Sequence, residues 1–240
     1  MIPPRDLLEI APSLHRLRIP DGQAHALNCY ILCENSGVTL IDTGWDHSAP
    51  LIEAALNDLG RTRADVTRII LTHFHDDHAG AAAEISGWGE IQIIAGAPEA
   101  AVIRGAETGP LARLTPAETG IHAQPTAPPA GPPCRVDVAV TDGDRLDIAG
   151  GVHILAAPGH THGSIALHFL ALDVVLTGDT VAEFFGEVIL GVFNVDRART
   201  RHSADRIAKA GASIAGFGHG EAILHDASAL IAAAADPFAD

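Results

Sequence analysis

The sequence predicts an α/β chain in which two β-sheets pack against each other with helices outside, and three observations support this. Apolar residues make up 47% of the 240 residues and charged residues only 19%, which suits a large buried core. Strands followed by a helix occur twice along the chain. One strand in each half ends in an Asp- and Thr-containing turn, Ile41-Asp42-Thr43-Gly44 and Thr177-Gly178-Asp179-Thr180. Because no linker separates the halves, we expect a single domain over residues 1–240.

The first half is expected to contain five strands and three helices. Apolar and alternating runs predict strands at 14–19, 27–33, 38–42, 67–71 and 91–95. A helix over 46–59 starts near His47 or Ser48, has Pro50 in its first turn and ends at Gly60. Shorter helices are predicted at 79–85 and 98–104.

Residues 105–133 interrupt this pattern, with seven prolines and almost no periodicity. We expect a long loop or insertion, either a plain surface connection or a segment that borders the active-site entrance. In the second case, shortening it should alter substrate preference and leave folding and metal content intact. Beyond it, strands are predicted at 136–141, 145–148, 152–156, 164–170, 174–177 and 213–217, and helices at 200–210 and 226–235.

A histidine-rich stretch follows the predicted strand 67–71 directly: Thr72-His73-Phe74-His75-Asp76-Asp77-His78. His73 and His75 stand two residues apart and can bind one ion together, while Asp77 and His78 can face a second ion after a turn. A polar, solvated loop is the alternative. Imidazole and carboxylate ligands without cysteine favour Zn²⁺, with Fe and Mn as alternatives.

The pattern His-x-His-x-Asp-His resembles the signature of the metallo-β-lactamase superfamily. Four more motifs of that family occur in the expected order. One lies before the signature, at Ile41–Gly44, and three lie after it, at Pro158–Ser164, Thr177–Thr180 and Gly218–Gly220. The resemblance implies a four-layer αββα sandwich of two mixed sheets flanked by helices, with two divalent metal ions at one edge.

The resemblance also implies a role for each candidate ligand. His73, His75 and His160 would bind one ion, Asp77, His78 and His219 the other, and Asp179 would bridge the two. Asp42 is expected to orient a ligand or the metal loop, although a simple turn residue is the alternative. Protonation of the leaving group falls to Asp77, our catalytic candidate, or to metal-bound water.

The expected function is a dinuclear, zinc-type hydrolase that cleaves a small ester, lactone, thioester or phosphodiester with water activated between the ions. Asp179 argues against a zinc β-lactamase, and Ala182 stands where similar lactonases carry a tyrosine. The short stretch after His219 disfavours a glutathione thioester. The alternative is an iron-dependent oxidoreductase similar to sulfur dioxygenases.

Four residues are candidates for the substrate pocket: His25, His162, Phe184 and Phe185. The two phenylalanines suggest an apolar acyl or aryl group, although paired core phenylalanines are the commoner meaning. His162 is also compatible with a solvated loop position.

Charge and cysteine content indicate the kind of substrate and the cellular compartment. A net charge of −15 disfavours nucleic acid, so we expect a small-molecule substrate. We find no signal peptide or membrane-spanning run, and three cysteines do not suggest a disulfide framework. Cys29 and Cys33 would lie about 13 Å apart on one strand. We therefore expect a cytoplasmic protein, and the sequence leaves the oligomeric state open.

Overall fold

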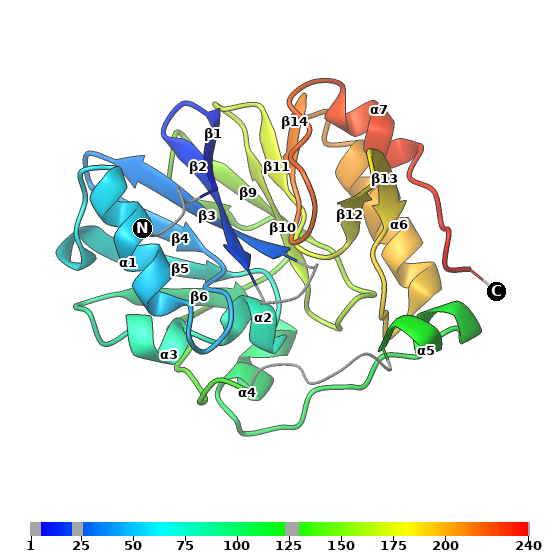
Figure 1. The fold of residues 1–240 in the computed structure, drawn as a ribbon, viewed down its shortest axis with the longest axis horizontal. Helices are drawn as coiled ribbons and strands as arrows, with labels where there is room; N and C mark the ends of the chain where they lie inside the picture. Colours follow the sequence, from blue (N-terminus) through cyan, green and yellow to red (C-terminus); the bar gives the residue numbers. More distant parts are fainter. Residues whose placement is uncertain (1–5, 21–25, 123–129, 240) are drawn as a thin grey trace.

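The computed structural model describes residues 6–20, 26–122 and 130–239, which form a four-layer α/β/β/α arrangement (Figure 1). Two β-sheets lie face to face, helices α1, α3 and α4 cover one outer face, and α6 and α7 cover the other. The αββα sandwich expected from the sequence is confirmed.

The first sheet has seven strands in the order β1-β2-β3-β4-β5-β6-β7. β1 to β4 run antiparallel, and β4 to β7 run parallel. The strands are β1 Leu7–Ala11, β2 Leu14–Pro20, β3 Ala26–Glu34, β4 Gly37–Ile41, β5 Val66–Leu71, β6 Gln92–Gly96 and β7 Val138–Val140.

The second sheet has five strands in the order β14-β11-β10-β9-β8, and a separate hairpin pairs β12 with β13. Only the β11–β14 pair is parallel in the second sheet. These strands are β8 Arg145–Leu146, β9 Val152–Ala156, β10 Ile165–Phe169, β11 Val174–Leu176, β12 Val181–Phe184, β13 Glu187–Leu190 and β14 Ile214–Gly216.

Seven α-helices and two 3₁₀ turns are present among the described residues. They are α1 Ala49–Asp58, η1 Arg63–Asp65, α2 Asp76–Ala79, α3 Ala82–Ile85, η2 Ala97–Glu99, α4 Ala100–Ile103, α5 Pro116–His122, α6 Arg197–Ala208 and α7 Ala227–Ala232. Within the described parts of the chain, no helix is both long and apolar enough to cross a membrane.

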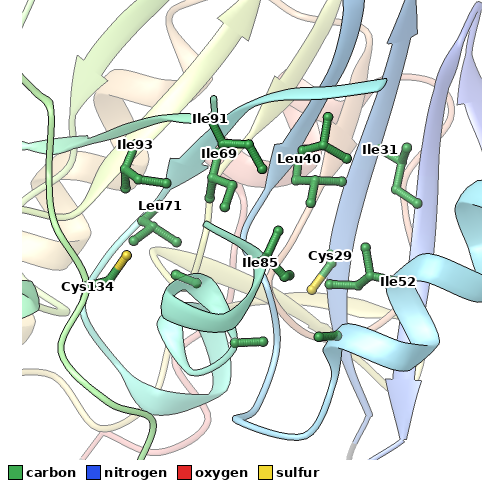
Figure 2. Close-up of a cluster of buried hydrophobic side chains, with 14 of the residues drawn as sticks. Cys29, Ile31, Leu40, Ile52, Ile69, Leu71, Ile85, Ile91, Ile93 and Cys134 are labelled. Atoms are coloured by element: carbon green, nitrogen blue, oxygen red, sulfur yellow. The ribbon is translucent and has the colours of Figure 1, made fainter. Parts of the chain in front are cut away.

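Side-chain alternation along the strands builds three apolar layers. On β5, Ile69 faces the helices α1, α3 and α4, whereas Ile70 faces the second sheet. On β11, Val175 faces α6 and α7, whereas Leu176 faces the first sheet. Figure 2 shows the first of these layers, with Ile69 and its neighbours packed against the helices. Both sheets are therefore held rigidly from two sides.

The strands that end at one edge of the sandwich include β4, β5, β9, β11 and β14. β4 and β5 run parallel in the first sheet, and β9, β11 and β14 share one direction in the second. Because side chains beyond the carboxyl ends of such strands meet at one edge, the turns after these five strands converge.

The structure differs from the sequence-based prediction at several places. β1 and the hairpin β12–β13 were not predicted. The segment 105–133, expected to be an aperiodic loop, contains the helix α5. β7, expected to open the second half, joins the first sheet beside β6. The helix α2 forms where a turn was expected, and the helix predicted over 98–104 is divided into η2 and α4. β9 is found with its predicted bounds, and the other predicted elements have shifted ends. Cys29, Cys33 and Cys134 are free thiols.

Candidate metal centre

The seven predicted ligands meet at the edge of the sandwich where β4, β5, β9, β11 and β14 end. His73 and His75 follow β5, and the short helix α2 then presents Asp77 and His78. The other three come from turns after β9, β11 and β14, namely His160, Asp179 and His219. Their ligand atoms form two groups, and within each group all atoms lie within 4.8 Å of one another.

The first group, here called the histidine group, consists of His73, His75 and His160. The Nδ1 atom of His75 lies 3.1 Å from Nε2 of His73 and 3.0 Å from Nε2 of His160. Around a tetrahedral zinc ion, neighbouring nitrogen ligands are separated by about 3.3 Å. The three nitrogens are therefore spaced as ligands of a single ion would be.

The second group, here called the mixed group, consists of Asp77, His78, Asp179 and His219. Nε2 of His219 lies 3.3 Å from a carboxylate oxygen of Asp77 and 3.3 Å from one of Asp179. Nε2 of His78 lies 3.2 Å from the other oxygen of Asp179. Two carboxylates and two imidazoles thus face a common point.

Asp179 lies between the two groups. Its Oδ2 atom is 3.6 Å from Nε2 of His160 in the histidine group and 3.3 Å from Nε2 of His219 in the mixed group. A single carboxylate therefore reaches side chains of both groups, which is the arrangement a bridging ligand needs.

Hydrogen bonds on the far side of the rings fix how they point. Nδ1 of His78 lies 2.8 Å from Asp42, and Nδ1 of His160 lies 3.1 Å from the carbonyl oxygen of Val192. Each contact leaves Nε2 as the atom that faces the site. Asp42 also accepts hydrogen bonds from both the backbone and the hydroxyl of Thr72.

The two groups differ in electrostatics. Burial and the nearby His160 lower the pKa of His75 to about 3, so this imidazole is neutral at neutral pH. Burial opposes charge on His219 as well, but Asp179 and Asp77 outweigh it and raise the pKa of His219 to about 10. Despite its burial, Asp77 has its pKa lowered to about 2 by His78 and His219. The mixed group thus attracts positive charge.

Buried polar atoms without hydrogen bonds show whether the two ligand groups suit cations. Nε2 of His78 and Oδ1 of Asp179 are buried and face each other at 3.2 Å, yet neither makes an aligned hydrogen bond with a described group, which is costly unless another group binds them. A Cβ atom at Gly218 would lie only 1.9 Å from Oδ1 of Asp179, so the chain approaches the site where no side chain fits. The donor set and these orphaned atoms fit divalent metal ions.

The turn that carries His219 is held by the first sheet. The side-chain amide of Asn28 donates to the carbonyl oxygens of Phe217 and Gly220, and the Tyr30 hydroxyl donates to that of Phe217. Arg16, itself buried, pairs with Glu221 beyond the turn. No motif in the sequence indicates these supports.

None of the remaining described candidates belongs to either ligand group. Asp76 is outside both groups and lines a pocket of about 210 Å³ with His75 and Gly131. His162 is exposed on the turn after His160. Phe184 ends β12, with 43% of its surface exposed, and Phe185 is 91% exposed in the turn of the hairpin. His25 lies outside the described residues.

Comparison with known proteins identifies the class. The family model of the Metallo-beta-lactamase superfamily matches residues 23–219, so the chain belongs to that superfamily. A metallo-beta-lactamase family protein from Thermus thermophilus is 26% identical, with a TM-score of 0.69 over 93% of this chain and 78% of that one.

Two curated relatives are similar in sequence. An uncharacterized protein of Mycobacterium leprae is 29% identical over 65% of this chain and 68% of its own length. A hydroxyacylglutathione hydrolase of Fuscovulum blasticum is 32% identical over 55% of this chain, and the match spans only 41% of that enzyme.

Proposed function

We propose that this protein is a dinuclear metal-dependent hydrolase, with zinc as the metal that best suits its ligands. The observation that carries the proposal is the position of Asp179, within 3.6 Å of His160 and 3.3 Å of His219. One carboxylate between two ligand groups supports two adjacent ions better than a single ion. The histidine group and the mixed group would each hold one of them.

Bound divalent ions would lower the pKa of water and polarise the bond to be cleaved. The chain's own residues would hold the ions in place. Asp42 and the Val192 carbonyl would keep His78 and His160 aimed at the site. The low pKa of Asp77 favours a carboxylate that binds an ion over one that carries a proton.

The proposed substrate is a small molecule with an ester, lactone, thioester or phosphodiester bond. Among these, a thioester is favoured because several similar sequences belong to proteins named hydroxyacylglutathione hydrolase. These matches span about a third to two fifths of the relatives' lengths, so the glutathione part of the substrate is not carried over.

The test combines metal analysis with a substrate panel. Protein reconstituted with Zn²⁺ should contain about two ions per chain and hydrolyse at least one class among model esters, lactones, thioesters and phosphodiesters. Oxygen uptake with iron-loaded protein serves as the counter-assay. A single bound ion, together with oxygen uptake and no hydrolysis, would contradict the proposal.

A further inference from the structure

Glu99 is a buried carboxylate close to both turns that supply the histidine group. It ends the 3₁₀ turn η2, between strand β6 and helix α4, and only 1% of its surface is exposed. It belongs to neither ligand group. A carboxylate at such depth requires hydrogen-bond donors that compensate for lost hydration.

Both oxygens of Glu99 bind backbone amides, one on each ligand-bearing turn. Oε2 accepts a hydrogen bond of 2.9 Å from the amide of Phe74, the residue between His73 and His75. Oε1 accepts one of 2.7 Å from the amide of Gly163, three residues after His160. One side chain therefore connects the turn after β5 with the turn after β9.

Two glycines allow the backbone to pack closely around the Glu99 side chain. A Cβ atom at Gly163 would lie 2.8 Å from both Cγ and Oε1 of Glu99. A Cβ atom at Gly96 would lie 2.2 Å from the carbonyl oxygen of Gly163. Two glycines thus allow the end of β6, the His160 turn and the Glu99 side chain to pack at backbone distance.

We propose that Glu99 is a positioning residue that sets the separation between His75 and His160, and so the geometry of the histidine group. The inference rests on the proposed metal site. Hydrogen bonds to a carboxylate are stronger than neutral ones, and their loss would leave two backbone amides without these acceptors. The two turns come from different sheets, so their relative position depends on such a cross-connection.

The test uses Co²⁺-substituted protein, because the visible absorption of Co²⁺ reports its ligand geometry. Three proteins are compared with the wild type: Glu99→Gln, Glu99→Asp, and the matched control Glu84→Gln, which alters an exposed glutamate on α3. The Gln side chain has one carbonyl oxygen and can accept a hydrogen bond from only one of the two backbone amides in the wild-type arrangement. The Asp side chain keeps the charge but is too short to reach both amides.

Both Glu99 variants should bind one ion on the order of 10–100-fold more weakly, the loss typical of residues that orient ligands. Their Co²⁺ spectra should change, whereas the second ion and the control should behave as in the wild type. Thermal melting of the metal-free proteins shows whether each variant is folded.

The outcomes separate the two proposals. Wild-type protein that binds no Co²⁺ would overturn the metal site and Glu99's role together. A normal wild type, with both Glu99 variants showing unchanged affinity and spectrum, would overturn only the role of Glu99. A lower melting temperature with an unchanged spectrum would likewise reduce Glu99 to a purely structural carboxylate. If Glu99→Gln fails to fold, the Glu99→Asp spectrum decides alone.

Discussion

At the scale of single residues, Asp179 carries most of the two-ion proposal. Replacement by Asn keeps the shape and removes the charge that faces both groups. We expect Asp179→Asn to lose about one of two bound ions and most hydrolytic activity, because an amide is a poorer bridging ligand than a carboxylate. Elemental analysis of the purified protein measures this. Asp147→Asn, at an exposed position, should retain both ions.

Asp76 and Asp77 are neighbours with different surroundings. Asp77 lies 3.3 Å from His219 in the mixed group, whereas Asp76 belongs to neither group and is hydrogen-bonded to the backbone of Gly131. Asp77→Ala should therefore lower kcat/KM by more than the roughly 100-fold upper range seen for residues that only orient ligands. Asp76→Ala should cost far less. Equal losses in a kinetic comparison would show that the assignment of Asp77 is wrong.

At the scale of elements, helix α5 changes how the Pro-rich segment is understood. Glu118 on α5 is fully buried, and it accepts hydrogen bonds from the Phe193 amide and the Arg197 guanidinium. Phe193 follows Val192, whose carbonyl oxygen contacts His160. In Figure 1 the chain runs from α4 along the lower edge of the molecule to α5, which lies near one end of α6. Part of the segment is therefore anchored next to the site.

We accordingly expect Glu118→Ala to destabilise the protein by about 3 kcal/mol, since it leaves buried donors without their acceptor. Urea unfolding measures this, and Glu107→Ala, exposed in the same segment, should change stability by about 0.5 kcal/mol or less. This revises our expectation that the whole segment can be shortened without effect on folding. Equal stability of the two variants would restore that expectation.

Local signals explain which elements the sequence could predict. The α5 helix begins with a reciprocal capping arrangement, because the Thr115 hydroxyl accepts from the Glu118 amide while Glu118 accepts from the Thr115 amide. Thr115-Pro116-Ala117-Glu118 is the sequence signature of such a cap, but the seven prolines of residues 105–133 favoured the prediction of a loop. The hairpin β12–β13 turns at Phe185 and Gly186, both with positive φ, where Asn-Gly is the usual indicator.

The same contrast holds for the candidate site. Metal-binding side chains can be read directly from the sequence, and the resemblance to the superfamily motifs nominated all seven residues that the structure brings into two groups. Their supports are not local: Asn28 donates to the carbonyl of Phe217 across 189 positions. Every residue has a backbone carbonyl, so the acceptor in such a contact does not depend on residue type. The contact therefore produces no pattern in the sequence.

At the scale of the whole molecule, the proposed ions would join the two halves. Four ligands come from the first half and three from the second. Each ion present at 100 times its Kd should add about 2.7 kcal/mol to the free energy of unfolding, provided that the unfolded chain does not bind it. Melting curves with Zn²⁺ and with a chelator measure the difference. Asp179→Asn should show a smaller shift than the wild type.

The spread of these side chains, from His73 to His219, also has a consequence for biosynthesis. A ribosome adds roughly 5–20 residues per second, so the last of the seven emerges on the order of 10 s after the first. During that interval His73, His75, Asp77 and His78 are present without His160, Asp179 or His219. If the proposed function holds, the nascent protein exposes an incomplete set of ligands, and an ion captured then would be held by fewer ligands and would exchange more readily than one bound after release.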